Sequence, residues 1–420
     1  MKRREFLTAG AAFGALVAAP AMANDTVLDD ILNQNARDSW TGGYDVSVAA
    51  GNTAEVASTV PVFSDRTVQS TFTAVNTYRN IVAGGGWPVV PAAKTLKLGM
   101  DEPAVATLRK RLMISGDLST RAGMSSLFDT YVEGAVKRFQ ARHGLPADGM
   151  LGKFSFAALN VPADTRLRQL EINLERLSQR MSADARPFGR YVMVNIPGAE
   201  IEAVEGGRVA QRHTAIVGRP SRPTPVLESQ ISELNLNPYW HAPKSIVLKD
   251  IIPLMRKDPS YLKDNGIRLY DAAKNEVDPR FVNWQTDEAV NYHFKQDPSR
   301  INAMRAAKIN FPNKHAVYMH DTPQQGLFDK LVRFESSGCV RVRNIRDLLT
   351  WLAKDTPGWN RQSLETTIAA GERTDALLTQ PVGVYFTYIS AWSVADGVVQ
   401  FRDDVYGRDG DRELEIGTMG

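Results

Sequence analysis

The chain has 420 residues and a formal net charge of +3, from 50 Lys and Arg against 47 Asp and Glu. A net charge this close to zero does not favour binding to nucleic acid or to an anionic membrane surface. The length is sufficient for two or three domains with their own cores, and the single cysteine excludes an intramolecular disulfide.

Residues 1–23 have the pattern of an export signal. A basic start at Lys2–Arg4 precedes the apolar run Phe6–Ala19, which is too short to span a membrane comfortably, and Ala21–Ala23 forms a small-x-small cleavage site. The Arg-Arg-x-Phe-Leu pattern resembles a twin-arginine signal, with an ordinary secretory signal as the alternative. The sequence therefore predicts a mature chain that begins at Asn24, is exported to the periplasm or cell wall, and keeps no stable membrane span.

Helices dominate the predicted structure of residues 24–188. Residues 24–95 are expected to form a scaffold, irregular at first and then helical over 68–81, and Gly84–Gly86 should end that helix. Residues 96–160 contain three short amphipathic helices, the first capped by Asp101. Three short helices bury only a small core, which suits a binding module better than an enzyme. His143 is expected to be partly exposed, and a long amphipathic helix within 161–188 should link this module to the next domain.

Extended segments begin at Tyr191. Short apolar runs with close turn signals predict a mainly antiparallel sheet or barrel over residues 189–380. Residues 245–311 interrupt this pattern, and we interpret them as an inserted lid of helices and loops whose first helix is capped by Ser245. Residues 381–420 should form a closing hairpin, with one strand over Val384–Trp392, and a charged tail. The predicted fold class is thus α+β and multidomain.

The single cysteine lies in the segment with the clearest chemical signal. Cys339 directly follows Gly338 and comes nineteen residues after His320, which ends a short apolar strand. A thiolate is a competent nucleophile, and a nearby histidine can accept its proton. In an oxidising compartment an unpaired thiol is either an intermolecular bridge or a reactive group. The backbone amides of Ser337, Gly338 and Cys339 are the candidates for an oxyanion hole.

Five further residues are candidates for lining or supporting the cleft. We expect a backbone carbonyl, rather than the adjacent Asp321 carboxylate, to orient His320. The six histidines show no ligand spacing, so neither a metal site nor a cofactor is predicted. Trp240 belongs to a proline-bounded aromatic segment. This segment is equally consistent with filling the apolar core and with forming a wall of the substrate cleft. The candidates are Tyr318, Asp321, Ser336, Arg341 and Trp240.

Two stretches resemble known families. Residues Ala135–Leu145, followed by Asp148 and Gly149, resemble the peptidoglycan-binding module of bacterial wall enzymes. His320–Pro323 (His-Asp-Thr-Pro) and Ser336–Val342 (Ser-Ser-Gly-Cys-Val-Arg-Val) resemble the signature of L,D-transpeptidases with a YkuD-type catalytic domain, of the large periplasmic type. Many members have a histidine where this chain has Ser337, although the large type commonly has serine there.

The resemblance implies a substrate and a mechanism. Cys339 would attack a tetrapeptide stem before its terminal D-alanine, and an amine of a second stem would resolve the thioester into a 3-3 crosslink, with His320 as base and then acid. The implied partners are donor and acceptor peptidoglycan stems and the glycan, and not nucleic acid; no protein partner is predicted. The same residues would serve an L,D-carboxypeptidase or a crosslink-cleaving hydrolase, and a catalytically silent wall-binding protein is the second alternative. A papain-like protease is disfavoured because its cysteine precedes its histidine.

Overall fold

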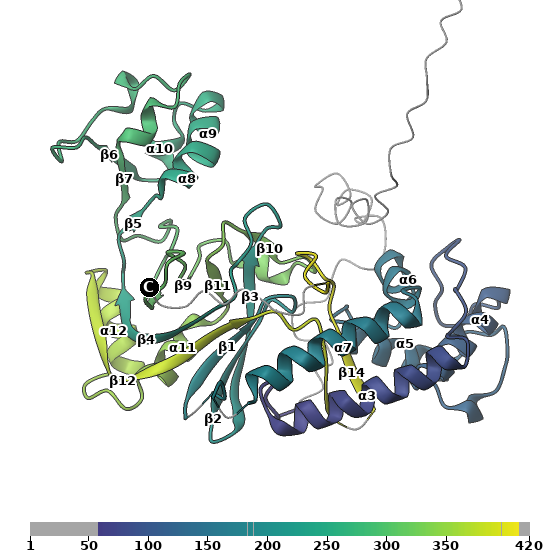
Figure 1. The fold of residues 1–420 in the computed structure, drawn as a ribbon. Coiled ribbons are helices and arrows are strands. Elements are labelled where there is room, and N and C mark those ends of the chain that lie inside the picture. The colour runs from purple at the N-terminus through teal and green to yellow at the C-terminus, as the bar shows by residue number, and fades with distance from the viewer. Residues whose placement is uncertain (1–57, 183, 188, 396, 411–420) are drawn as a thin grey trace, which may run out of the picture. The chain divides into compact units, whose positions relative to one another are not determined.

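The computed structural model describes residues 58–182, 184–187, 189–395 and 397–410 (Figure 1). The predicted export signal and most of the irregular lead-in lie outside the described residues.

Helices α3 to α6 form the N-terminal part of the described chain. The helix predicted over 68–81 is confirmed as α3, where Ser64 Oγ accepts from the Thr67 amide and Gly84 ends the helix. Glu102, not Asp101, precedes α4, because Pro103 holds the residue before it in an extended conformation. Helices α4 to α6 surround a small core of their own. Their bounds are α3 (Asp65–Ala83), α4 (Pro103–Ile114), α5 (Thr130–Arg142) and α6 (Lys153–Leu159).

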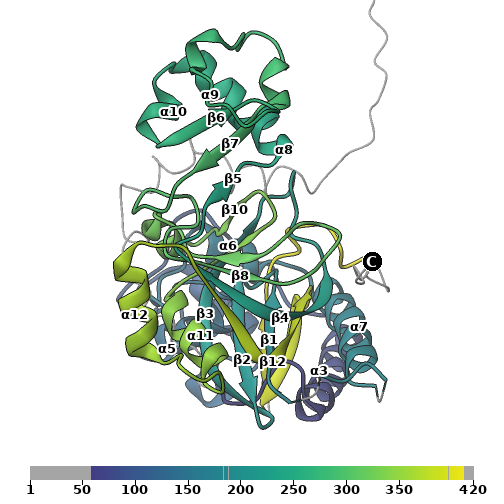
Figure 2. The same ribbon diagram turned by 90° about the vertical axis from the view of Figure 1, so that its left-hand side faces the viewer.

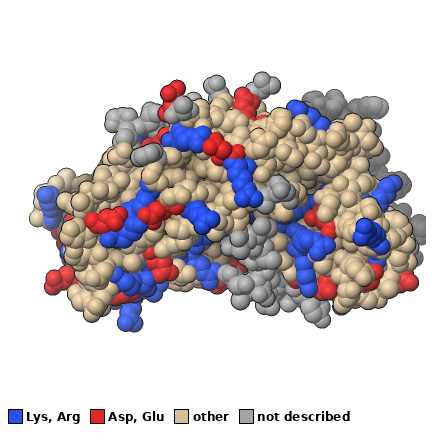
Figure 3. Space-filling model, turned by 90° about the horizontal axis from the view of Figure 1, so that it is seen from below, with Lys and Arg blue, Asp and Glu red and all other residues tan. Residues whose placement is uncertain are grey.

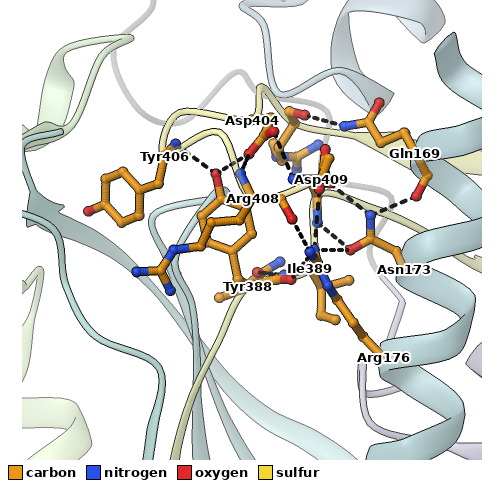
Figure 4. A network of polar contacts seen from close by, with 12 residues as sticks. Gln169, Asn173, Arg176, Tyr388, Ile389, Asp404, Tyr406, Arg408 and Asp409 are labelled. Carbon is orange, nitrogen blue, oxygen red and sulfur yellow. Dashed lines mark hydrogen bonds and ion pairs between the residues drawn. The ribbon is translucent and has the colours of Figure 1, made fainter. Parts of the chain in front are cut away.

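The predicted long helix is α7 (Ala163–Arg180), which lies beside α3 (Figures 1 and 2). An apolar face of α7 packs against α3 and the C-terminal hairpin. Its polar face is bound to the C-terminal segment: Asn173 Nδ2 donates to Ser390 Oγ at 2.8 Å, and Arg176 Nη1 donates to the carbonyl of Tyr388 at 3.1 Å (Figure 4). The helix therefore binds the segment that follows the last strand of the central sheet.

The central sheet has nine strands in the order β10-β3-β11-β9-β8-β4-β12-β1-β2, and an additional β3–β2 pairing closes eight of them into a barrel. Six pairings are antiparallel and three are parallel (β1–β12, β10–β3 and β11–β9), so the predicted mainly antiparallel sheet is confirmed. The strands are β1 (Tyr191–Asn195), β2 (Glu200–Glu205), β3 (Arg208–Gly218), β4 (Leu227–Leu236), β8 (Ala307–Asn310), β9 (Met319–His320), β10 (Phe334–Ser336), β11 (Val340–Val342) and β12 (Thr374–Thr387).

Apolar side chains from alternate strand positions form one core with α11 (Ile345–Ala353) and α12 (Arg361–Ala370). The prediction of one strand over Val384–Trp392 is wrong. Strand β12 ends at Thr387, because the next amides, those of Ile389 and Ser390, donate to the side chains of Asn195 and Asn173 instead of to a strand. The closing hairpin consists of β13 (Ala391–Ala395) and β14 (Val398–Phe401).

The segment between β4 and β8 forms a separate small unit, which we call the lid. It contains helices, as expected, and also a three-stranded sheet in the order β5-β7-β6 that the sequence pattern did not predict. Its first helix begins at Lys244 after Pro243, so the predicted cap at Ser245 is wrong. The lid has its own apolar core. Its elements are β5 (Trp240–His241), α8 (Lys244–Ile246), a π-helical turn (Val247–Ile251), α9 (Ile252–Lys257), α10 (Tyr261–Asp264), β6 (Ile267–Tyr270) and β7 (His293–Gln296).

Acidic and basic side chains are interspersed on the face that Figure 3 displays. This mixture agrees with the nearly balanced composition of the chain. Among the described helices, none combines the length and hydropathy that crossing a bilayer requires. The α+β fold class, with a helical module and a mostly β domain, is confirmed.

Candidate active site

The short parallel pair β9–β11 brings the candidate residues together. Met319 and Val340 lie opposite each other in this pair, and both are fully buried in the barrel core. Side chains alternate between the two faces of a strand, and directly opposed residues share a face. The opposite face of the pair therefore carries four of the predicted residues: Tyr318, His320, Cys339 and Arg341.

A tight turn between β10 and β11 presents Cys339. Gly338 has φ +113°, which a residue with a side chain rarely adopts. Ser336 Oγ accepts from the Gly338 amide at 3.1 Å and donates to the Cys339 carbonyl at 2.5 Å. The buried Thr224 Oγ1 donates to the Gly338 carbonyl at 2.9 Å. These contacts fix the backbone on both sides of the thiol.

The loop that contains Thr224 folds back onto the end of β3 at Gly218. A Cβ atom at Gly218 would lie 2.3 Å from the Arg222 carbonyl oxygen, so only glycine fits there. Tyr406, from the C-terminal segment, accepts from the Thr224 amide at 3.2 Å and donates to the Gly218 carbonyl at 2.5 Å. The sequence did not indicate that residues so distant from Cys339 support its turn.

Of the three amides predicted for an oxyanion hole, the Gly338 amide is occupied by Ser336 Oγ. The amides of Ser337 and Cys339 have no hydrogen-bond partner among the residues that the structure describes. Two neighbouring donors on one turn can stabilise a developing oxyanion. The structure thus leaves two of the three predicted donors available to a substrate.

His320 is buried and oriented through its own main chain. Its Nδ1 lies 2.5 Å from the carbonyl oxygen of Asp321, as the sequence analysis expected. Because a carbonyl only accepts, Nδ1 carries the proton of the neutral ring, and a backbone contact with Ala303 also raises the pKa of His320. The Asp321 carboxylate points elsewhere, accepting from the amides of Thr322 and Ala306. Burial and then the charge of Arg341 lower the pKa of His320 to about 3, so the ring is neutral at physiological pH.

Cys339 is only partly exposed, and its thiol also favours the neutral state. Burial raises its pKa above the ordinary value of 9.0, while hydrogen bonds from Tyr318 oppose that rise. The Tyr318 hydroxyl also interacts with Trp240, which packs in the lid core. Tyr318 thus connects the lid to the thiol, and Trp240 is both a core residue of the lid and a support of the site. The resting pair is a neutral thiol and a neutral imidazole rather than an ion pair.

A lysine that the sequence analysis missed lies on the same face. Lys308 of β8 is directly opposite His320 of β9, and its Nζ lies 4.5 Å from the centre of the Tyr318 ring. The spacing of residues 307–310 gave no signal, because the β8–β9 register is not readable from a four-residue strand. Burial lowers the pKa of Lys308 and the charge of Cys339 raises it, which indicates that the two side chains interact.

Polar contacts join the lid to the thiol-bearing turn. Arg222 forms an ion pair with Asp250 in the π-helical turn of the lid, at 2.5 Å, and also donates to Ser337 Oγ at 2.8 Å. π-Helical turns occur frequently at functional sites. We call this chain of three residues the lid contact. It links the lid directly to the residue two positions before Cys339.

Within the described part of the chain, no group of three or more His, Cys, Asp or Glu side chains could hold a metal ion. The site therefore consists of main-chain amides and a few side chains arranged around one thiol. Such an arrangement can carry out nucleophilic acyl transfer, in which an imidazole base activates the thiol and amides stabilise the oxyanion.

Comparisons with known proteins agree with this chemistry. Residues 189–359 match the family described as "L,D-transpeptidase catalytic domain" (YkuD), and residues 101–159 match "Putative peptidoglycan binding domain". A protein of Haemophilus influenzae described as "Putative L,D-transpeptidase" is 33% identical over 253 residues, which are 60% of this chain and 50% of that protein. The chain thus spans about half the length of the curated relative it matches.

Solved structures with some likeness include two L,D-transpeptidases. One from Xylanimonas cellulosilytica is 17% identical, with a TM-score of 0.23, and the match covers 71% of this chain and 99% of that one. One from Stackebrandtia nassauensis is 14% identical, with a TM-score of 0.24, and the match covers 71% of this chain and 96% of that one. Residues 189–359 are thus similar to the catalytic domain of L,D-transpeptidases, and residues 101–159 are similar to a peptidoglycan-binding domain.

Proposed function

We propose that this protein is a peptidoglycan L,D-transpeptidase that forms 3-3 crosslinks through a thioester on Cys339. The observation that carries the proposal is the shared face of β9 and β11, where the Cys339 thiol lies with His320 over a fully buried apolar layer. The family of the catalytic domain supports the same reaction class.

In the acylation step, Nε2 of His320 takes the thiol proton while sulfur attacks the carbonyl carbon of the third stem residue. The amides of Ser337 and Cys339 stabilise the oxyanion that forms. The peptide C–N bond then breaks, the imidazolium gives its proton to the departing amine, and D-alanine leaves. A neutral resting pair suits this sequence, because His320 accepts a proton only as the thiol becomes a nucleophile.

In the second step, an amine of an acceptor stem attacks the thioester. His320 accepts the proton of that amine and returns it to the sulfur, so the free thiol is restored and a 3-3 crosslink remains. The match of residues 101–159 to a peptidoglycan-binding domain supports the same polymer as a partner, in addition to the stem peptides. We place the working protein outside the cytoplasm, in the periplasm or wall of a bacterium, in agreement with the peptidoglycan-related domains and with the export pattern of residues 1–23.

Incubation of the purified protein with disaccharide-tetrapeptide tests the proposal. Mass spectrometry should detect a tripeptide thioester on Cys339, free D-alanine and crosslinked dimers. Cys339→Ala should abolish the adduct, and His320→Gln should slow its formation by about 100-fold or more. His315→Gln, a change at an exposed histidine in the preceding loop, is the matched control.

Each other outcome identifies a different function. Tripeptide monomers without dimers would replace crosslinking by L,D-carboxypeptidase activity, and cleavage of added 3-3 dimers would indicate a hydrolase that opens crosslinks. Full activity of Cys339→Ala would refute the thioester. If no stem peptide were converted, the protein would be a wall-binding protein without catalytic activity.

A further inference from the structure

The register of three neighbouring strands places two cations on either side of the candidate base. Lys308 of β8 is opposite His320 of β9, and His320 is opposite Arg341 of β11. Adjacent strands lie about 4.8 Å apart, so these three side chains form one row across the sheet. Both cations lower the pKa of His320. The row therefore surrounds the base with positive charge.

The two cations differ in where their charged groups lie. The partly exposed Arg341 guanidinium donates to the exposed side chain of Gln324 at 2.7 Å, and its charge acts on Cys339 as that of Lys308 does. The Lys308 ammonium instead lies over the ring of Tyr318, whose hydroxyl is hydrogen-bonded to Cys339. Lys308 thus extends from its position opposite His320 in the sheet toward the Cys339 thiol.

No carboxylate of the described residues forms an ion pair with Lys308, although the charges of Glu233 and Asp375 act on it. Its ammonium has no ion pair or hydrogen-bond partner among them, although its side chain is half-buried. The nearest acidic side chains are engaged by other groups: Glu233 accepts from Asn235 at 2.5 Å, and Asp375 accepts from Asn235 at 2.8 Å and from Arg373 at 2.6 Å. A partly desolvated cation without a protein partner is suited to an anionic ligand group.

We infer that Lys308 determines donor specificity by binding the terminal carboxylate of the residue that leaves. The inference rests on the proposed function. In a donor cleaved one residue from its end, three bonds separate the attacked carbonyl carbon from the carbon of the terminal carboxylate, and two bonds separate that carboxylate carbon from the departing nitrogen. A cation that recognises this carboxylate must therefore lie within a few ångströms of both the thiol and the group that protonates the leaving nitrogen. Lys308 occupies that place beside Cys339 and His320.

Two donors that differ at one group test the assignment. One is a tetrapeptide stem with a free terminal carboxylate, and the other is the same stem with a terminal carboxamide. The second-order rate constant for acylation of Cys339, measured by mass spectrometry of the intact protein, should be about 10- to 100-fold higher for the carboxylate donor, as for a hydrogen bond to a charged group. Lys308→Gln should reduce this preference to about threefold or less by slowing the carboxylate donor more than the carboxamide donor, and Lys308→Arg should retain most of it.

Lys314→Gln, in the exposed loop between β8 and β9, is the matched control and should keep the wild-type preference. An equal loss for both donors in Lys308→Gln would make Lys308 a structural residue and overturn the inference. Equal rates for both donors in the wild-type protein would overturn it without any variant. Acylation by neither donor would instead refute the proposed function on which the inference rests.

Discussion

The module of residues 101–159 and the lid are both small units with their own apolar cores, but they are attached to the rest of the molecule by different kinds of contact. The module is joined through buried rings and buried charges. The lid is joined to the barrel where β4 and β8 meet it, and through partly exposed polar side chains near the thiol. The buried contacts favour a fixed position of the module. The polar contacts allow a change in the lid to alter the reactivity of the thiol.

On the module side, the contact is centred on the end of α5. Arg142 forms a two-pronged ion pair with Asp117, at 2.7 and 2.6 Å, and also donates to the carbonyl of Val399 in the hairpin. His143 is stacked between Phe139 and Phe401, with ring centres 3.9 and 5.4 Å away. The expectation that His143 is partly exposed is therefore wrong, because Phe401 of the hairpin covers it.

On the lid side, the contacts converge on the turn that carries Cys339. The lid contact joins Asp250, Arg222 and Ser337, and its ion pair is partly exposed. Trp240 and Tyr318 form the second connection. Changes on the module side should therefore act on stability, whereas changes on the lid side should act on the reactivity of the thiol.

The largest expected effect is on the module side. Asp117→Asn leaves the buried Arg142 without its partner and should lower the free energy of unfolding by about 3 kcal/mol, with acylation of Cys339 by a small donor unchanged. Urea unfolding measures the first quantity, and hydrogen exchange should place the loss in α5. Asp164→Asn is the control, because its ion pair with Arg168 is 3.9 Å long and exposed. Equal stability of the two variants would contradict the stabilising role assigned to the buried pair of Asp117 and Arg142.

Lowering the pH should weaken the contact between the module and the C-terminal hairpin. Burial, and then the charge of Arg142, hold the pKa of His143 well below its ordinary value of 6.5. A group whose pKa is lowered on folding contributes stability above the unfolded pKa and loses it as the pH falls below that value. His143 should therefore remove up to about 1.4 kcal/mol per pH unit below pH 6.5. Urea unfolding of wild type and His143→Phe between pH 5 and 7.5 measures this slope, and identical slopes would show that His143 does not contribute.

On the lid side, Asp250→Asn and Arg222→Met should each slow acylation of Cys339 by about three- to tenfold while changing stability by less than about 1 kcal/mol. The double variant should be no slower than the slower single variant, because both changes break one connection. Asp278→Asn is the control, since its exposed pair with Arg280 stays within the lid. Losses that multiply in the double variant would show that Arg222 and Asp250 act separately.

The smallest expected effect concerns the second connection of the lid. Tyr318→Phe keeps the ring under Lys308 but removes the hydroxyl that hydrogen-bonds to Cys339. The pKa of the thiol should rise further, and alkylation by iodoacetamide at pH 8 should slow by about two- to fivefold. Tyr292→Phe, which loses a hydroxyl contact with Glu288 inside the lid, should react like the wild type. A faster reaction in Tyr318→Phe would reverse the role assigned to this hydrogen bond.

Local patterns predicted much of the fold and of the candidate site. The thiol and His320 lie on segments close in sequence, and helix periodicity located α3 and α7. Lys308 could not be predicted, because its place depends on a register set by pairing across the sheet. The burial of His143 could not be predicted either, because Phe401 comes from the opposite end of the chain. The lid sheet was missed since its strands are short and separated by loops.

The ends of the lid meet. Asn237, just after β4, donates its amide to the carbonyl of Ala306, just before β8, at 2.9 Å, and the next pair inward is Leu236 opposite Ala307. Strands β4 and β8 are therefore the two arms of one hairpin, and the whole lid occupies the position of its turn. In evolutionary terms, a single insertion at a hairpin tip suffices to add such a unit, and the barrel strands need not be reordered to accept it or to exchange it for another.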